Sequence, residues 1–363
     1  MGSWPDRRIL DLFGIELPII QAPMAGSTTP EMVIAVSEAG GLGSLPCAQY
    51  DLAQARAALE QVKAGTSRPC NVNFFCHRVP APDPAREQAW RQHLAPLYRE
   101  QGLDPAMPLK PGGRTPFDAA FCGLVEEYRP SVVSFHFGLP ELALLDRVKA
   151  TGAKVIGSAT TVREARWLEE RGCDAVIAMG YEAGGHRGNF LGHAEQGDPN
   201  ADMVQQVGSF ALIPQVVDAV KVPVIAAGGI ADARGIVAAF ALGAAAVQIG
   251  TAYLFSPEAK IAPFYRAALK SATDDATVVT NLFTGRPARG IVNRVMREVG
   301  PMSPDAPAFP LAGGALAPLR AKAEAAGSGD FTNLWAGQAA ALARELPSGE
   351  ITRRLAEEAL AKL

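Results

Sequence analysis

The residues with the clearest capacity for chemistry lie in the run Gly180–Gly188, which places a glutamate, a histidine and an arginine among four glycines. Glycines at this density allow the backbone to turn sharply or to approach a ligand closely. His186 and Arg187 could supply positive charge for an anionic substrate or a phosphate, or they could simply be solvated side chains of a loop. Glu182, His186 and His193 have a spacing that suits a metal only on a helix, which so many glycines disfavour, so we expect no metal.

His136 is the candidate general base. It ends the apolar run Val132–Phe135 and stands between two phenylalanines. A histidine in such surroundings is often only a core residue, but the carboxyl end of a parallel strand is where barrel enzymes keep catalytic groups. In a partly desolvated pocket the imidazole is neutral near pH 7 and can accept a proton. None of the five cysteines has the context of a nucleophile.

Two other loops have the composition of a phosphate site. Gly228 and Gly229 open directly into an expected helix, so backbone N–H groups and the helix dipole could hold an anion. The run Gln248–Thr251 ends the next strand with small and hydrogen-bonding groups. Loops after the seventh and eighth strands are the usual phosphate site of (β/α)₈ barrels. We therefore expect a phosphate-bearing ligand, although glycines at such turns could alternatively serve packing alone.

Eight short apolar segments, separated by helical stretches, must position these loops. The expected strands are Ile19–Ala22, Leu42–Leu45, Asn71–Phe75, Val132–Phe135, Lys154–Ser158, Ala175–Ala178, Val224–Ala227 and Ala246–Ile249. The expected helices between them are Pro30–Ala39, Leu52–Ala64, Phe117–Tyr128, Pro140–Ala150, Val162–Arg171, Phe210–Val220 and Asp232–Leu242. Strands that are apolar throughout are typical of a parallel sheet buried on both faces. Eight such units favour a closed barrel, because the Gly-x-Gly-x-x-Gly turn of an open doubly wound sheet is missing after the early strands.

Two segments interrupt this alternation. Residues 79–116 are rich in proline and contain one expected helix, Arg86–Arg99, and after residue 255 helices alternate with turn clusters. The predicted fold class is therefore α/β, a (β/α)₈ TIM barrel with an insertion and a C-terminal extension that form a small helical cap. We assign the barrel to residues 1–78 and 117–255. The cap, which would contact the substrate, comprises residues 79–116 and 256–330, and residues 331–363 form C-terminal helices that return to the barrel.

Composition excludes several classes of function. A net charge of −3 with both signs mixed gives no electrostatic case for nucleic-acid binding. No apolar stretch is long enough to cross a membrane, and the N-terminal residues lack the apolar core of a secretion signal. Five scattered cysteines fit reduced thiols better than a disulfide framework. We expect a cytoplasmic protein, a monomer or a homodimer, that acts on a small molecule.

The chain resembles the class I nitronate monooxygenases, a family of FMN-dependent TIM-barrel enzymes. The segment around His136 and the ending His186-Arg187-Gly188 are more specific to this class than the other matching segments, which flavin barrels of other activities share. The matching segments extend along nearly the whole chain and are Ile20–Gly26, Asn71–Phe75, Ser134–Pro140, Gly180–Gly188, Val222–Ile230, Gln248–Thr251, Gly285–Gly290 and Leu334–Gln338.

The resemblance implies an oxidoreductase that uses FMN and O₂ to detoxify nitronates by oxidative denitrification. Its substrates would be propionate-3-nitronate, alkyl nitronates and nitroalkanes, and its products a carbonyl compound with nitrite or nitrate. His136 would be the catalytic base for neutral nitroalkanes, and His186 and Arg187 would attract the anionic substrate. The residues that would bind the cofactor are Ala22, Pro23, Met24, Asn73, Met179, Gly184, Gly185, Gly228, Gly229, Gln248, Gly250 and Thr251.

Two positions depart from the family pattern. Met179 stands where many members have a glutamine that contacts the flavin, so one hydrogen bond to the cofactor is missing. Phe309-Pro310 stands where some members have a Tyr-Pro pair, which removes a hydroxyl group near the substrate.

The alternative function is that of an NAD(P)H-dependent FMN reductase on the same barrel, acting on quinones or enoyl thioesters. Enoyl-thioester reductases of this kind share the Gly-Gly-His loop. They usually have an apolar residue where Arg187 stands and a Gly-Gly-Met turn in place of Ala22-Pro23-Met24. A flavin- or phosphate-binding barrel without catalytic activity is a further alternative.

Overall fold

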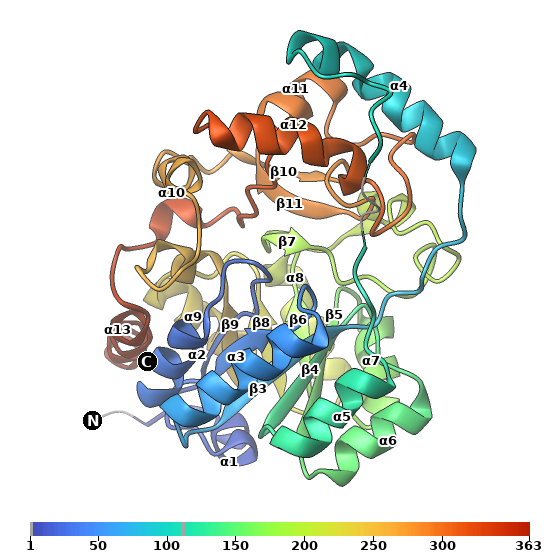
Figure 1. The fold of residues 1–363 in the computed structure, drawn as a ribbon. Coiled ribbons are helices and arrows are strands. Elements are labelled where there is room, and N and C mark those ends of the chain that lie inside the picture. Colours follow the sequence, from blue (N-terminus) through green and yellow to red (C-terminus); the bar gives the residue numbers. More distant parts are fainter. Residues whose placement is uncertain (1–2, 110–112) are drawn as a thin grey trace.

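An eight-stranded parallel sheet, closed into a barrel, forms the centre of the molecule (Figure 1). The computed structural model describes residues 3–109 and 113–363. The strands, in chain order, are β1 (Ile19–Gln21), β2 (Gly43–Pro46), β3 (Cys70–Phe75), β4 (Val132–His136), β5 (Lys154–Ala159), β6 (Ala175–Met179), β8 (Val224–Ala227) and β9 (Ala246–Ile249). Ladders run from β1 through β9 round to β2, and a parallel bridge between Ile20 and Leu42 joins the two end strands. The predicted (β/α)₈ fold class is confirmed.

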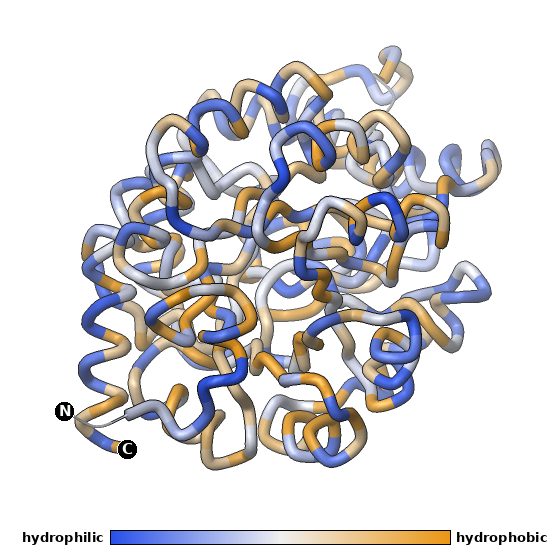
Figure 2. The backbone as a smooth tube through the Cα atoms, turned by 90° about the horizontal axis from the view of Figure 1, so that it is seen from below, coloured by the Kyte–Doolittle hydropathy of each residue, from blue (hydrophilic) through white to orange (hydrophobic). Residues whose placement is uncertain are grey.

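Helices cover the outside of the barrel and follow the strands as predicted. They are α2 (Pro30–Glu38), α3 (Leu52–Gly65), α5 (Ala119–Tyr128), α6 (Leu142–Ala150), α7 (Val162–Glu170), α8 (Ser209–Ala219) and α9 (Ala233–Ala241). Local signals fix their ends: the Asp232 carboxylate accepts the first free N–H groups of α9, and Gly243 follows the same helix in the left-handed conformation. The outer helices mix hydrophilic and hydrophobic residues (Figure 2). In the described part of the chain, no helix combines the length and the hydropathy needed to cross a membrane.

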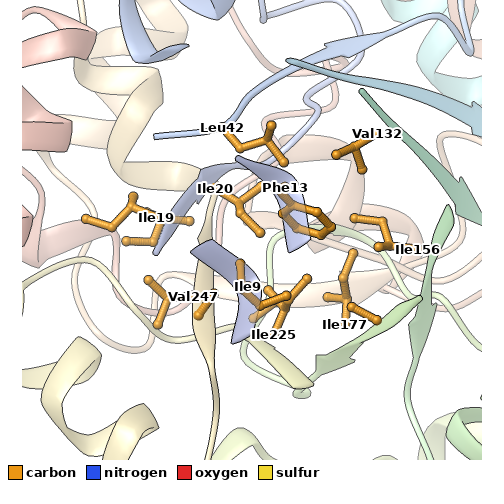
Figure 3. Close-up of a cluster of buried hydrophobic side chains, with 14 of the residues drawn as sticks. Ile9, Phe13, Ile19, Ile20, Leu42, Val132, Ile156, Ile177, Ile225 and Val247 are labelled. Carbon is orange, nitrogen blue, oxygen red and sulfur yellow. The ribbon is translucent and has the colours of Figure 1, made fainter. Parts of the chain in front are cut away.

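One end of the barrel is filled by a short helix that the sequence pattern did not predict. This helix, α1 (Arg8–Phe13), inserts Ile9 and Phe13 among apolar side chains from the strands (Figure 3). Ile9 is completely buried and Phe13 nearly so. Access to the barrel interior is therefore from the opposite end, where the carboxyl ends of the strands lie.

A cap lies above the carboxyl ends of the strands (Figure 1). Its core joins α4 of the insertion to the C-terminal extension through buried residues that include Trp90, Leu94, Leu316 and Phe331. The assignment of the chain to a barrel, a cap and returning helices stays a prediction in its boundaries. The elements outside the barrel are β7 (Gly185–His186), β10 (Thr277–Thr280), β11 (Ala288–Ile291), α4 (Pro84–Glu100), α10 (Pro263–Lys270), α11 (Arg294–Val299), α12 (Gly313–Ala325), α13 (Ser348–Leu360) and the 3₁₀ helices η1 (Ala201–Gln205), η2 (Thr251–Phe255) and η3 (Ala340–Leu342).

A small antiparallel sheet connects the barrel to the cap. Its strand β7 belongs to the glycine-rich loop after β6 and pairs with β11 of the C-terminal extension, so that His186 lies opposite Ala288. The next residue continues this connection, because the Arg187 N–H donates to the carbonyl of Pro287 at 2.8 Å. The glycine-rich loop after β6 is thus held by both the barrel and the C-terminal extension.

Candidate active site

The loops singled out in the sequence open onto one cavity of about 470 Å³ between the strand ends and the cap. This volume lies within the usual range of small-molecule sites. Every predicted site residue except Arg187 lines the cavity. Those present are Ala22, Pro23, Met24, Asn73, His136, Met179, Gly184, Gly185, His186, Gly228, Gly229, Gln248, Gly250 and Thr251.

One side of the cavity presents backbone N–H groups that have no acceptor in the described residues. They belong to Gly229, Ile230, Gly250 and Thr251, in the loops after β8 and β9. Both loop glycines at the end of β8 have positive φ, +104° at Gly228 and +72° at Gly229, which other residues rarely adopt. Because the Asp232 side chain already caps α9, the loop itself and not the helix terminus offers these donors. Converging free N–H groups form a site for a phosphate.

The glycine-rich loop leaves no room for side chains on this side. A Cβ atom at Gly184 would lie 2.5 Å from the backbone nitrogen of Gly337. Gln248 adds an acceptor here, since its buried Oε1 has no hydrogen-bond partner among the described residues. The cavity wall therefore offers both donors and an acceptor that the protein leaves unpaired.

The barrel floor of the cavity is polar and ordered by hydrogen bonds. The Asn73 amide Nδ2 donates to the Ser134 hydroxyl at 2.9 Å and to the Ser134 carbonyl at 3.2 Å. The amide oxygen of Asn73 has no such partner in the part of the chain that the structure describes. Asn73 is thus fixed in orientation with an acceptor free for a ligand N–H.

His136, at the end of β4, has hydrogen-bond partners for both ring nitrogens. Its Nε2 donates to the carbonyl of His186 at 3.2 Å, and its Nδ1 accepts from the Ser158 hydroxyl at 3.1 Å. Burial and the positive charge of Arg286 lower the pKa of His136 to about 3. The ring is therefore neutral at physiological pH.

His186, at the end of β7, has one engaged and one free ring nitrogen. Its Nε2 lies 2.9 Å from the Thr284 hydroxyl. That hydroxyl also reaches the carbonyl of Arg286 at 3.3 Å, so it can donate there and accept from His186. Nδ1 then carries the lone pair and has no partner in residues 3–109 and 113–363. Burial and then the charge of Arg114 hold the pKa of His186 well below its usual value, so the positive charge predicted for this residue is absent.

Arg187 does not line the cavity, and its predicted contact with an anionic substrate is wrong. Its side chain is completely buried and points back beneath the glycine-rich loop. The guanidinium donates to the carbonyls of Met179 and Gly180 and to Gln206 Oε1, at 2.8 Å for Met179 and 2.9 Å for the Nη2–Gln206 bond. The Met179 carbonyl ends β6 and would otherwise be buried without a donor, which explains the direction of the side chain; the Gly180 carbonyl also accepts from the Ala183 N–H at 3.2 Å.

Three cationic side chains line the cavity, Arg114, Lys260 and Arg320, and the sequence patterns singled out none of them. Arg114 is the one that lies over the Phe75 ring. It lies in the insertion, with its guanidinium carbon 5.7 Å from the ring centroids of both Phe75 and Phe309. Among the described residues no carboxylate forms an ion pair with it. Burial lowers the pKa of Arg114 to about 10, so it stays charged at neutral pH. One signal in the sequence could have pointed to Arg114, namely its position. It lies in the segment before α5, which is the loop that follows β3.

The other polar residues of the glycine-rich segment serve the fold. The Glu182 carboxylate accepts from the backbone N–H of Ser209 at 2.8 Å and from its hydroxyl at 2.9 Å. His193 contacts Asp202 at 2.9 Å. Glu182 and His193 therefore have separate partners, and the structure brings no metal-binding group together from Glu182, His186 and His193.

Comparison with known proteins identifies close relatives. The profile of the nitronate monooxygenase family matches residues 6–358. A nitronate monooxygenase from Pseudomonas aeruginosa is 44% identical, with 97% of this chain and 98% of the relative aligned. The crystal structure of nitroalkane oxidase from Streptomyces ansochromogenes superimposes with a TM-score of 0.87 at 38% identity, covering 98% of each chain. FabK from Thermotoga maritima is less similar, with a TM-score of 0.74 at 30% identity over 99% of this chain and 97% of FabK.

Replacement of Arg187 should destabilise the protein. Arg187→Met leaves the Met179 carbonyl buried without a donor and removes the charge-assisted bonds to Gly180 and Gln206, so we expect the free energy of unfolding to fall by about 3 kcal/mol or more. Urea denaturation measures the change. Arg99→Met, at an exposed position on α4, is the matched control and should change stability by less than about 0.5 kcal/mol. An equal effect of both substitutions would contradict the role of Arg187.

Proposed function

The chain belongs to the nitronate monooxygenase family, an oxidoreductase family of nitronate metabolism, and we propose that it oxidises nitronates with O₂ by means of bound FMN. The products would be a carbonyl compound and nitrite or nitrate. The observation that carries the proposal is the cavity between the strand ends and the cap, which combines backbone N–H groups able to hold a phosphate, neutral imidazoles and the Arg114 cation, which forms no ion pair among the described residues. A cytoplasmic location and a monomeric or homodimeric state remain predictions.

The residues of the cavity fit FMN. The free N–H groups of the loops after β8 and β9 would hold its phosphate, and the unpaired Gln248 Oε1 would accept from a ribityl hydroxyl. The backbone of Ala22–Met24 and the amide of Asn73 would contact the ring system, where Met179 offers only an apolar contact. When bound, the flavin supplies the electron transfer and the reaction with oxygen, and the protein supplies binding and orientation.

The anionic substrate would be bound by Arg114. A nitronate carries its negative charge on the nitro oxygens, and a guanidinium offers several donors to such a group. The two histidines nearby are neutral, whereas Arg114 keeps its charge. Its position over Phe75 and Phe309 keeps it out of bulk water, which strengthens its attraction for an anion.

We propose His186 in place of His136 as the base that takes the α-proton of a neutral nitroalkane. A base needs a free lone pair within reach of the substrate. His186 Nδ1 provides one in the cavity, whereas both nitrogens of His136 are engaged. By donating to the carbonyl of His186, His136 would position the loop that carries the base.

Two asparagine variants distinguish these roles. His186→Asn should lower the rate on nitroethane by about 10²- to 10⁴-fold and change the rate on ethylnitronate, which needs no base, only a few-fold. His136→Asn should affect both substrates to a similar and smaller extent. Steady-state oxygen consumption with each substrate measures these rates. Selective loss of nitroethane turnover in His136→Asn alone would restore His136 as the base.

The role of Arg114 is tested by its KM effect. Arg114→Gln should raise the KM for propionate-3-nitronate by about tenfold or more, because the substrate loses a charge-assisted contact worth at least about 1.4 kcal/mol. Arg114→Lys, which keeps the charge, should recover part of this loss. An unchanged KM in both variants would exclude Arg114 from substrate binding.

The overall activity is tested with the purified holoprotein. Propionate-3-nitronate should cause oxygen uptake and nitrite release in the absence of a reduced nicotinamide. Rapid bleaching of the flavin by NADH without oxygen, combined with no oxygen uptake on any nitronate, would instead show the reductase activity.

A further inference from the structure

A second cavity, of about 930 Å³, lies beside the first and has no part in the proposed reaction. It is formed by the start of the insertion, the segment after the glycine-rich loop, and the turn between β10 and β11. Phe137 and Phe309 line it and pack against Phe75 of the first cavity, with ring centroids 4.8 Å and 6.4 Å from the Phe75 ring. An aromatic partition therefore separates the two spaces.

Arg286 supplies a buried positive charge to the second cavity. Its side chain is buried, with 8% exposed, and its guanidinium carbon lies 3.9 Å from the centroid of the Phe137 ring. One nitrogen donates to the carbonyl of Asn189, but Nε has no partner among the described residues, and no carboxylate there forms an ion pair with it. Burial lowers the pKa of Arg286 to about 10, which leaves it charged at neutral pH. A buried guanidinium with an unused donor is costly unless an anion binds it.

Other unpaired polar atoms gather around the same cavity. In the described residues, seven buried side-chain polar atoms lack a hydrogen-bond partner, and four of them belong to residues that line this space. Besides Arg286 Nε they are Arg86 Nε, Asn200 Oδ1 and His77 Nδ1. His77 is 6% exposed, and its Nε2 donates a hydrogen bond to the carbonyl of Arg114. Such a concentration of unpaired groups is what a site for a polar ligand requires.

The remaining lining combines apolar walls with an open rim. Trp167 and Phe190 pack edge to face, with ring centroids 5.0 Å apart, and offer a surface for an apolar group. Arg78, Glu195 and Asp198 also line the cavity, and all three are exposed. The two acids are therefore hydrated at the rim, whereas Arg286 is a buried charged side chain among the lining residues; the carboxylates of Glu164 and Asp202 offset part of its charge.

We propose that the second cavity is a binding site for an organic anion with an aromatic or other apolar body. The anionic group, a carboxylate or a phosphate, contacts Arg286 and Arg86, and the body packs against Trp167 and Phe190. The volume is about twice that of the first cavity, which is far more than a small nitronate fills. This site goes beyond the proposed oxidation of nitronates and does not depend on it.

Isothermal titration calorimetry of the holoprotein, without substrate turnover, tests the proposal. The probes are 3-phenylpropionate, phenyl phosphate and the neutral 3-phenylpropanamide. We expect one-to-one binding of at least one anion and about tenfold or more weaker binding of the amide, since a charge-assisted contact is worth at least about 1.4 kcal/mol. The comparison of the two anions shows which anionic group the site prefers.

Four variants locate the binding site. Arg286→Gln and Arg86→Gln should each weaken binding of the preferred anion by about tenfold or more. Arg86 is half-buried near the start of α4, so Arg86→Gln tests the location of the site if Arg286→Gln does not fold. Arg99→Gln, exposed near the end of the same helix, is the matched control and should leave the affinity unchanged, as should Arg114→Gln in the first cavity.

Two outcomes would overturn the proposal. The first is the absence of binding heat for both anions. The second is binding that Arg114→Gln abolishes and that Arg86→Gln leaves unchanged, because the probe would then occupy the first cavity. Neither outcome depends on nitronate oxidation, so this proposal and the proposed function can fail separately.

Discussion

The arrangement of the site depends on how Arg187 satisfies the buried carbonyls at the end of β6. Its guanidinium holds the carbonyls of Met179 and Gly180, while its own N–H donates to the carbonyl of Pro287 in the extension. One residue thus ties the barrel to the cap. With this bond in place, β7 pairs with β11, and His186 is carried into the cavity opposite Ala288. An arginine suits this position because its donors are numerous and its charge is compensated by several oxygen acceptors.

Burial and several arginines together determine the protonation states of the histidines in the cavities. Arg114 and Arg286 lie against aromatic rings on the two sides of the partition formed by Phe75, Phe137 and Phe309. Their charges add to the cost of desolvating an imidazolium, so both histidines stay neutral while the arginines remain charged. The β10–β11 turn links the two spaces, since Thr284 contacts His186 and also the carbonyl of Arg286.

The sequence predicts those features that depend on local patterns. From apolar runs and helix-capping residues such as Asp232, the ends of all eight strands were predicted to within one residue. The loops around Asn73, Gly229 and Gln248 meet in one cavity as predicted. The side-chain directions of Arg187 and Arg114 were beyond such reasoning. The first depends on which buried carbonyls lack donors, and the second on where a proline-rich insertion crosses the barrel, and both are set by tertiary structure.

The low basicity of His186 bears on which substrates the site suits best. The efficiency of a general base falls when its pKa lies far below the working pH. Burial and the charge of Arg114 lower the pKa of His186, yet the same charge attracts an anion. Under the proposed function, a nitronate would arrive without the α-proton, so it would gain from Arg114 and lose nothing from the weak base. A neutral nitroalkane gains less from Arg114 and needs the base. In the proposed reaction, the cavity is therefore better matched to nitronates than to nitroalkanes.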